Sequence, residues 1–318
     1  MASPFDSVRW IWVNGEMVPF ADAKVHLLTH ALHYGSAWFE GIRCYETVSG
    51  SAVFRLRDHM VRLETSCKLY RADLPYTVDE LCRATVETIQ ANELPACYIR
   101  PIIWRGFGSV GVNPLPCPVE AAIAVWPWGS YLGEGAADAG VDVCVSSWRR
   151  TNSESLPSIA KAAGGYLNCQ LVKMEALLAG FAEGIALDSD GYVSEGSSEN
   201  LFLVQDGVLW TPPLCCSILP GITRDTVLKI AQEDGIPVRE EHISRGALYA
   251  CDELFLTGTA AEITPVRSVD RIPVRAHGPG PVTRQLQARF NAVIRGETLD
   301  RHGWLTPVPA LVPVGAGG

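Results

Sequence analysis

Residues 158–171 have the sequence SIAKAAGGYLNCQL and place a lysine, Lys161, among small and apolar residues. The nearest charged residues along the chain are Glu154 on one side and Lys173 on the other. A lysine on a solvated helix usually has a carboxylate three or four residues away, and these positions offer Pro, Ser and Gly instead. A desolvated lysine has a lowered pKa and becomes a usable amine nucleophile, so Lys161 is a candidate catalytic residue. A snorkelling side chain or a distant ion pair is the alternative.

The segments that follow Lys161 alternate between helix and strand. A helix is predicted from about Tyr166, with Leu167, Leu171 and Met174 on its apolar face. From residue 185 onward strands dominate, with Asp-Gly turn signals at 190–191 and 206–207. The stretch TRDTVLKIAQEDG, residues 223–235, predicts a helix that stops at its final glycine.

The first 125 or so residues also mix strands and helices. WIWVNGEMVP (10–19) predicts a hairpin with an Asn-Gly turn, and CYIRPIIWR (97–105) and AAIAVWPW (121–128) predict buried strands. Thr77 and Glu80 form a capping-box pattern at the start of an amphipathic helix. GFGSVG (106–111) matches a dinucleotide-binding motif, but the three prolines that follow exclude the helix that this motif must open.

A Gly-, Pro- and Ala-rich segment, residues 127–140, is the predicted linker between two domains. It separates a small α/β domain, 1–126, from a large domain, 141–305, and residues 306–318 are expected to be a disordered tail. The predicted fold class is therefore a two-domain combination of α/β and α+β structure.

Composition limits the functional classes. Hydrophobic residues make up 47% of the 318 residues, so a large core is expected, and the net charge of −9 argues against a nucleic-acid surface. No apolar run reaches the length of a membrane span, and the first residues lack the features of a signal peptide.

The ten cysteines form no CxxC pair, which argues against zinc and redox motifs, so we expect buried reduced thiols, no metal site and a cytoplasmic protein. Cys215 and Cys216 are the exception, because they lie in a predicted loop. His30 and His33 lack a nearby third ligand and are interpreted as structural.

Several features together indicate pyridoxal phosphate. Gly221, Ile222 and Thr223 begin a helix after a proline, where backbone amides suit a phosphate, and the turn Gly258–Ala261 offers further amides. Glu195 lies in a stretch without other charges until Glu199, and a lone buried carboxylate needs a proton or a cation. A phosphate site, an isolated lysine and an isolated carboxylate match the phosphate, aldehyde and ring nitrogen of this cofactor.

The sequence closely resembles the branched-chain amino acid aminotransferases, which are fold-type IV pyridoxal-phosphate enzymes with a D-amino acid aminotransferase-like architecture. The motifs that carry the resemblance run nearly end to end: WVNGEMVP, HALHYG, FEGIRCYET, YIRPIIW, PWGSYLG, AKAAGGYL, EGIALDSDGYVSEGSSENLF, LPGITRDTV and TGTAAEITPVRSVD. The resemblance implies transfer of an amino group between Leu, Ile or Val and 2-oxoglutarate, with pyridoxal 5'-phosphate as cofactor.

The resemblance also implies roles for individual residues. Lys161 is expected to form the Schiff base, Tyr166 to hydrogen-bond the phenolic oxygen of the cofactor, and Glu195 to face its pyridine nitrogen. The further residues expected to bind the cofactor, mainly its phosphate, are Arg62, Leu219, Gly221, Ile222, Thr223 and Thr259. The expected substrate site comprises Tyr34, Phe39, Gly41, Tyr98, Arg100, Val112, Trp128, Tyr131, Ala260 and Ala261.

Within this substrate site, Arg100 and Tyr34 are expected to recognise the distal carboxylate of glutamate, with Tyr131 nearby. The pocket for an apolar side chain is expected to be walled by Phe39, Trp128 and Tyr131. The loop around Val112 is expected to come from a neighbouring subunit, which makes a homodimer the minimal unit and leaves a hexamer open. Amino acids and 2-oxo acids are the implied partners, with no nucleic acid and no membrane.

The sequence departs from the family pattern at three places: Gly165 where Asn is usual, Cys215 and Cys216 where hydroxyl residues are usual, and Trp38 where a smaller aliphatic residue is common. These departures bear on the substrate rather than on the cofactor. The alternatives are a related transaminase for D-amino acids, chiral amines or a specialised amino acid, an aminodeoxychorismate lyase-like enzyme, and a catalytically idle homologue.

Overall fold

The computed structural model describes residues 3–129, 131–133 and 135–310. These residues divide into two compact units, one from 3–129 and 292–310 and the other from 131–291. The sequence-based division placed 292–305 in the second domain, whereas the structure assigns them to the first unit. The predicted linker includes a short helix, α4 (Ala136–Ala139). Of the predicted disordered tail, Thr306 and Pro307 belong to a strand, and 311–318 lie outside the described residues.

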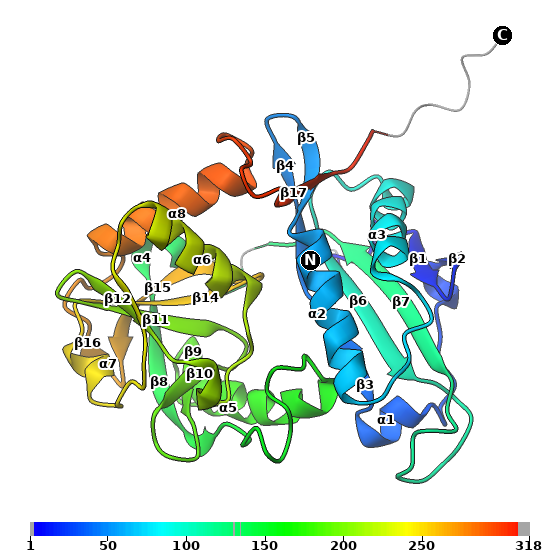
Figure 1. The fold of residues 1–318 in the computed structure, drawn as a ribbon, viewed down its shortest axis with the longest axis horizontal. Helices are drawn as coiled ribbons and strands as arrows, with labels where there is room; N and C mark the ends of the chain where they lie inside the picture. Colours follow the sequence, from blue (N-terminus) through cyan, green and yellow to red (C-terminus); the bar gives the residue numbers. More distant parts are fainter. Residues whose placement is uncertain (1–2, 130, 134, 311–318) are drawn as a thin grey trace. The chain divides into compact units, whose positions relative to one another are not determined.

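The described part of the first unit is built on an eight-stranded antiparallel sheet with the order β17-β5-β4-β6-β7-β1-β2, in which β3 also pairs with β6 (Figure 1). Helices α2 and α3 cover one face of this sheet. The strands are β1 (Trp10–Val13), β2 (Glu16–Pro19), β3 (Ala37–Phe39), β4 (Ile42–Thr47), β5 (Gly50–Phe54), β6 (Cys97–Arg105), β7 (Val119–Trp126) and β17 (Leu305–Pro307). The helices are α1 (His30–Tyr34), α2 (Leu56–Leu69) and α3 (Val78–Asn92), with a 3-10 turn, η1, at Phe20–Asp22.

Local sequence signals explain several of these elements. Asn14 and Gly15 both have positive φ, as the Asn-Gly turn of the predicted β1–β2 hairpin requires. The Thr77 hydroxyl accepts a hydrogen bond from the Glu80 N–H while the Glu80 carboxylate accepts one from the Thr77 N–H, so the predicted capping box begins α3. No helix follows residues 106–111 in the described chain before β7, which agrees with rejection of the dinucleotide motif.

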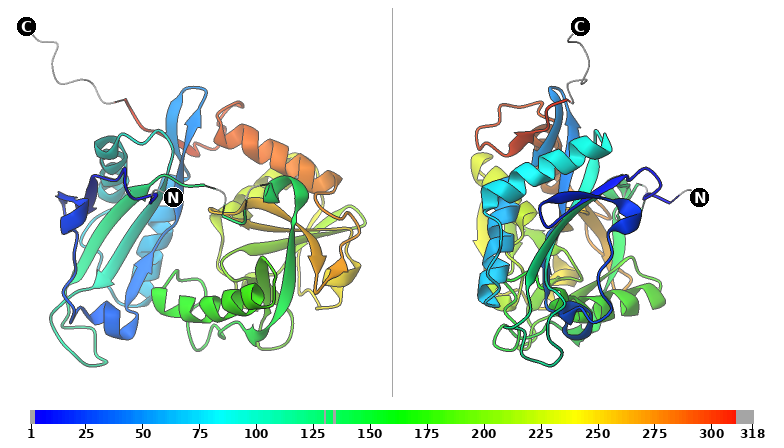
Figure 2. Two further views of the ribbon diagram at one scale, coloured as in Figure 1. Left: turned by 180° about the vertical axis from the view of Figure 1, so that it is seen from behind. Right: turned by 90° about the vertical axis from the view of Figure 1, so that its right-hand side faces the viewer.

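The described part of the second unit contains a nine-stranded mixed sheet with the order β10-β9-β8-β15-β14-β11-β12-β13, and β16 pairs with β15 (Figures 1 and 2). Its strands are β8 (Val141–Arg149), β9 (Glu183–Leu187), β10 (Val193–Gly196), β11 (Asn200–Gln205), β12 (Val208–Thr211), β13 (Val238–Glu240), β14 (Glu253–Gly258), β15 (Glu262–Val269) and β16 (Ile272–Pro273). Besides α4, its helices are α5 (Tyr166–Leu178), α6 (Ile222–Glu233), α7 (Ala247–Ala250) and α8 (Pro281–Ile294), with 3-10 turns η2 (Ala163–Gly165) and η3 (Leu214–Cys216).

The core of this unit is formed mainly by apolar strand residues such as Val143, Ile185, Leu201 and Leu254. Helix α5 packs against β8 and β9, and α6 packs against β13 and β14. The predicted helix over 223–235 is confirmed as α6, and Gly235 follows its end with a φ of +70°.

The predicted apolar face of α5 is wrong. Its buried residues are Cys169, Val172 and Ala176, whereas Leu167 and Met174 are 65% and 50% exposed. Helical periodicity identified the set of apolar residues but did not identify which of them faces the sheet.

Candidate active site

Lys161 lies in the second unit, on the segment that connects β8 to α5. Its side chain is half-buried, and Nζ donates a hydrogen bond of 2.5 Å to the hydroxyl of Tyr166, the first residue of α5. The turn η2 between the two residues brings the amine 5.1 Å from the centre of the tyrosine ring. The structure therefore brings the predicted lysine and tyrosine into direct contact.

Glu195, on β10, is a buried carboxylate with three polar partners. Its Oε1 lies 2.7 Å from a guanidinium nitrogen of Arg150, and its Oε2 accepts hydrogen bonds from Nδ2 of Asn200 and the backbone N–H of Leu219. Burial raises the pKa of Glu195 above its usual range, although the charges of Arg150 and Lys161 and the Leu219 N–H act to lower it. These contacts take up three of the roughly four acceptor positions of a carboxylate, so Glu195 can accept a further hydrogen bond.

Arg150, immediately after β8, was missed by the sequence analysis. Besides Glu195, it contacts the Cys169 sulfur at 2.9 Å. Burial acts to lower the pKa of Arg150, but the negative charge of Glu195 raises it overall. An arginine directly after a strand that begins VDVCVSS is a weak signal of a buried ion pair, because an arginine at a strand end can equally lie in solvent. Its pairing with Glu195 depends on tertiary structure.

The start of α6 lies next to Glu195 because one amide side chain joins them. Asn200 Nδ2 donates to Glu195 and also to the backbone carbonyl of Leu219, two residues before Gly221. A Cβ on Gly221 would lie 1.8 Å from Asn200 Oδ1, so only glycine fits at this N-cap position. The first turn of α6, with Ile222 and Thr223, presents backbone N–H groups for which a helix has no internal acceptor.

Thr257 is a further residue that the sequence analysis did not identify. It pairs with Asn200 across β14 and β11, so the two side chains lie on the same face of the sheet. Its hydroxyl is buried and has no hydrogen-bond partner among the described residues. A buried hydroxyl without a partner beside Asn200 indicates a polar group that binds here.

The predicted turn is confirmed: Thr259, Ala260 and Ala261 connect β14 to β15, and binding by their backbone stays a prediction. Gly258 at its start lies over Glu199, since a Cβ there would be 3.7 Å from Glu199 Cγ. Ser198, next to Glu199, has its hydroxyl 3.4 Å from the hydroxyl of Tyr131.

Glu199 and the neighbouring Glu183 are both buried carboxylates. Glu183 accepts hydrogen bonds from Lys173 and from the N–H groups of Gly184 and Ser197. Burial, followed by the charge of Glu183, raises the pKa of Glu199 to about 8. Glu199 therefore holds a proton at neutral pH.

In the first unit, the predicted substrate residues Phe39, Tyr98, Arg100 and Trp128 form one cluster. The Arg100 guanidinium lies 4.8 Å from the Phe39 ring centre, and the rings of Tyr98 and Trp128 are 4.5 Å apart. A Cβ on Gly41 would lie 2.0 Å from the Tyr98 hydroxyl, which explains the glycine. The Nε of Arg100 is buried without a hydrogen-bond partner in the described residues, so it is available to an anion.

Arg62, on α2 in the first unit, donates two hydrogen bonds of 2.7 Å to the buried carboxylate of Glu40. Burial acts to raise the pKa of Glu40, but the charge of Arg62 and the hydrogen bonds from Arg62 and His59 hold it well below its usual range. The expected contact of Arg62 with phosphate stays a prediction.

Two predicted residues lie at the surface of the first unit. Tyr34 ends α1, is 47% exposed and packs against the ring of His30. Val112 is 83% exposed, and the preceding Gly111 carbonyl is hydrogen-bonded to His30. The buried His30 also contacts Ser36, which agrees with its structural interpretation.

The groups in the second unit fit pyridoxal phosphate. The amine of Lys161 suits its aldehyde, the buried carboxylate of Glu195 its ring nitrogen, and the N-terminus of α6 its phosphate. The Thr257 hydroxyl, unpartnered among the described residues, offers a further polar group. The glycine at 221 leaves the backbone open at the start of α6. This combination fits a phosphorylated aldehyde cofactor.

Comparisons with known proteins agree with this site. The family model for class IV amino-transferases matches residues 37–269. A branched-chain-amino-acid aminotransferase of Salmonella typhimurium is 53% identical over 300 residues, covering 94% of this chain and 97% of that protein. The crystal structure of the Escherichia coli branched-chain amino acid aminotransferase superposes with a TM-score of 0.94 at 52% identity, covering 95% of this chain and 100% of that chain.

A third relative was solved with the cofactor. The branched-chain amino acid aminotransferase of Thermobaculum terrenum, in its holo form with pyridoxal phosphate, has a TM-score of 0.89 and 38% identity, covering 95% of this chain and 98% of that chain. The chain belongs to the class IV aminotransferase family. The predicted fold-type IV architecture is confirmed.

Proposed function

We propose that this chain is a pyridoxal-phosphate-dependent branched-chain-amino-acid transaminase. It transfers the amino group of Leu, Ile or Val to 2-oxoglutarate, giving a branched 2-oxo acid and L-glutamate. The observation that carries the function is the 53% identity to curated branched-chain aminotransferases over nearly the whole chain. The contact of Lys161 with Tyr166 and the buried Glu195 supply the chemistry that the function needs.

When bound, pyridoxal phosphate supplies an aldehyde that accepts the amino group and a ring that takes up the electrons left on the substrate α-carbon. Lys161 would hold that aldehyde, and its Nζ, when free, would move the proton from the substrate α-carbon. Tyr166 orients this amine through its 2.5 Å hydrogen bond. Glu195, fixed by Arg150, Asn200 and Leu219, keeps a proton on the ring nitrogen.

The remaining roles are proposals for individual residues. Arg62, Ile222, Thr223 and Thr259 bind the phosphate, with Leu219 and Gly221 shaping the backbone before α6. Arg100, with Tyr34 and Tyr131, binds the distal carboxylate of glutamate, which is supported by the unpartnered buried Nε of Arg100 among the described residues. The other substrate residues form the apolar wall of the pocket and the site of the substrate α-carboxylate. They are Phe39, Gly41, Tyr98, Val112, Trp128, Ala260 and Ala261.

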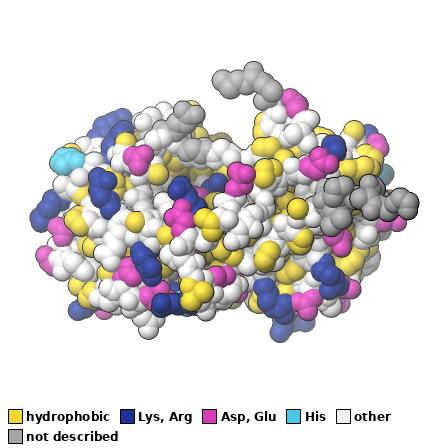
Figure 3. Space-filling model, turned by 90° about the horizontal axis from the view of Figure 1, so that it is seen from above, with side chains coloured by type: hydrophobic (Ala, Val, Ile, Leu, Met, Phe, Trp, Pro, Cys, Tyr) yellow, Lys and Arg dark blue, Asp and Glu magenta, His cyan; other side chains and the backbone are white. Residues whose placement is uncertain are grey.

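We also propose a homodimer at minimum and a cytoplasmic location. Exposed apolar side chains at Leu27, Leu32, Phe107 and Val112 support an interface between copies of the chain. All ten cysteines lie in the described chain as free thiols, eight of them buried, which supports a reducing compartment. Acidic and basic side chains are interspersed on the face shown in Figure 3, which does not favour a nucleic-acid partner.

None of the described helices is long and apolar enough to cross a bilayer.

A donor series tests the function. Purified protein is incubated with 2-oxoglutarate and, in turn, L-valine, L-leucine, L-isoleucine, D-alanine and a chiral amine, and L-glutamate is measured. We expect glutamate with the three branched L-amino acids only. A cofactor-loaded protein that turns over none of these donors would contradict the proposal.

Lys161→Ala tests the anchor. We expect loss of transamination together with loss of the long-wavelength absorption of lysine-bound cofactor, because no other amine of the site replaces Nζ. The fold is checked by circular dichroism. An unchanged visible spectrum would rule out Lys161 as the anchoring residue.

A further inference from the structure

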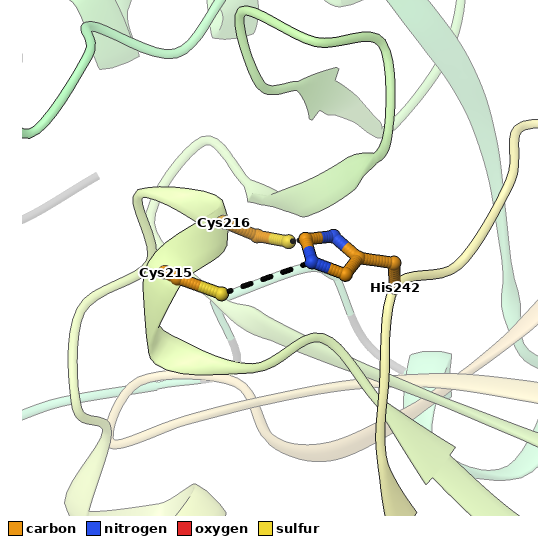
Figure 4. Close-up of side chains that lie close together, drawn as sticks. All are labelled: Cys215, Cys216 and His242. Atoms are coloured by element: carbon orange, nitrogen blue, oxygen red, sulfur yellow. Dashed lines mark hydrogen bonds between the residues drawn. The ribbon is translucent and has the colours of Figure 1, made fainter.

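A cluster of metal-ligating side chains lies in the second unit, outside the residues that bind cofactor or substrate. Cys215, Cys216 and His242 each place one ligand atom so that all three atoms lie within 4.8 Å of one another (Figure 4). Cys216 Sγ is 3.3 Å from His242 Nδ1, and Cys215 Sγ is 3.9 Å from His242 Nε2. The two cysteines are 26 or more residues from the histidine in the chain, which is why their spacing shows no zinc motif.

The fold explains why these residues meet. Strands β12 and β13 are parallel neighbours, so the segments that leave their carboxyl ends emerge at the same edge of the sheet. The segment after β12 forms η3 with the two cysteines, and the segment after β13 carries His242. A hydrogen bond from the Glu241 N–H to the Thr211 carbonyl joins the two segments just before they diverge.

Two of the three ligands are held in place by neighbouring residues, and the third is free to move. The Cys216 side chain is fully buried, and its backbone carbonyl accepts a 2.6 Å hydrogen bond from the Ser194 hydroxyl. The His242 ring packs against the Tyr192 ring, with centroids 4.6 Å apart. Cys215 is exposed, so its side chain can rotate and the site is open to an ion from solution.

The ligand chemistry of the cluster favours a thiophilic cation. The Asp188 carboxylate interacts with the Cys216 thiol beside the cluster. Asp188 Oδ1 already accepts the N–H groups of Asp190 and Tyr192, so the carboxylate is a neighbour of the site and not one of its three ligands. Thiolate sulfur and imidazole nitrogen suit zinc-like ions, whereas Mg²⁺ and Ca²⁺ require oxygen ligands.

We propose that Cys215, Cys216 and His242 bind a divalent cation of the zinc class, with water in the fourth position. Tetrahedral sites with sulfur and nitrogen ligands have metal–ligand bonds of about 2.0–2.3 Å, which separates the ligand atoms by roughly 3.3–3.8 Å. Rotation of the exposed Cys215 side chain closes the present cluster to that size. The ion fixes the segment that leads through Leu219 to Gly221, and so links two strand ends to the start of α6.

The test uses the full-length, cofactor-loaded protein, kept reduced and freed of metal with a chelator that is then removed. Zn²⁺ is added, unbound ion is removed by gel filtration, and bound zinc is measured by atomic emission. Co²⁺ replaces Zn²⁺ in a parallel sample as a spectroscopic probe. We expect about one ion per chain, and a Co²⁺ spectrum with thiolate charge transfer and strong visible bands of a tetrahedral site.

The variants Cys215→Ser and His242→Gln change exposed side chains and should weaken binding by more than about 10-fold, with folding checked by circular dichroism. Cys82→Ser is the matched control, because this half-buried thiol on α3 lies outside the cluster, and it should bind as the unmodified protein does. Failure to bind either ion, equal binding by the two cluster variants and the control, or a Co²⁺ spectrum without thiolate charge transfer would overturn the proposal. None of these readouts depends on transaminase activity.

Discussion

Arg150 and Glu195 form a buried ion pair, but only Glu195 could be recognised from the sequence as a candidate site residue. Glu195 is isolated from other charges along the chain, whereas Arg150 follows another arginine at the end of a strand. Arg150 supplies the positive charge that lets a carboxylate remain in a buried position. It is therefore a positioning residue for Glu195.

Arg150→Met should destabilise the protein by about 3–5 kcal/mol, because it leaves the Glu195 carboxylate buried without its cation. Arg149→Met is a matched control at the adjacent, exposed position and should change stability by no more than about 0.5 kcal/mol. Urea unfolding of both variants measures the difference. Equal stability of the two variants would mean that Glu195 does not depend on Arg150.

At the scale of elements, the two helices nearest the cofactor groups both begin at a glycine. Gly165 precedes α5 with a φ of −69°, and a Cβ there would meet nothing within 4 Å. Gly221 precedes α6, and a Cβ there would collide with Asn200. The unusual Gly165 is thus a position that accepts a side chain, whereas Gly221 is required.

Gly165→Ala should stabilise the protein by about 0.4–1 kcal/mol, because it restricts the unfolded chain without straining the folded one. Gly221→Ala should destabilise it by about 1–3 kcal/mol through overpacking against Asn200. Gly221→Ala should also weaken pyridoxal phosphate binding. Thermal unfolding measures the stability of both variants, and titration with pyridoxal phosphate measures their cofactor affinity. A Gly165→Ala protein less stable than the unmodified protein would contradict the expected difference.

Elements with local signals were predicted well from the sequence. The Asn-Gly hairpin, the capping box of α3 and the glycine after α6 each depend on a few neighbouring residues. The face of α5 was predicted wrongly because leucine and methionine positions share helical periodicity with the smaller residues that contact the sheet.

In the candidate site, too, contacts between residues close in sequence could be predicted, and contacts between distant residues could not. Lys161 and Tyr166 are five residues apart, so their contact follows from one turn of chain. Other contacts join strands or strand ends that are distant in sequence, so no spacing rule identifies them. These are the ion pair of Arg150 with Glu195, the pairing of Thr257 with Asn200, and the contact of Cys215 with His242. The substrate roles came from the family resemblance and stay predictions.

At the scale of the whole molecule, Glu199 makes the stability of the protein depend on pH. Its pKa is raised from 4.5 to about 8, so between these values the folded state keeps a proton that the unfolded state has released. Stability conferred by this group therefore falls as pH rises through that window.

Glu199→Gln should remove this dependence. Relative to the unmodified protein, the variant should gain stability as pH rises from about 5 to 8, at up to about 1.4 kcal/mol per pH unit. Urea unfolding across this range measures the difference, with Glu241→Gln as a control at an exposed carboxylate. A difference that does not change with pH would show that Glu199 ionises normally.

The proposed assembly also has a test at this scale. Leu32 on α1 is 60% exposed and neighbours the loop that carries Val112, so Leu32→Glu should place a charge in the interface and shift the protein toward monomers. Leu299→Glu, at an 80% exposed leucine away from α1 in the chain, is the control and should leave the mass unchanged. Light scattering after size-exclusion chromatography reads out the mass. An unchanged dimer in Leu32→Glu would place the interface elsewhere.

Asn200 uses one amide nitrogen to hold both Glu195 and the Leu219 carbonyl, and its oxygen faces Gly221. One side chain thus joins the two ends of the proposed cofactor site, and we expect a change at one end to affect the other. If the two ends are coupled, a ligand at the α6 end changes the affinity for a ligand at the Glu195 end by some factor. Thermodynamic reciprocity then requires that the second ligand changes the affinity for the first by the same factor. Cofactor fragments, a pyridine without phosphate and a phosphate without a ring, should bind this protein cooperatively and not as independent halves.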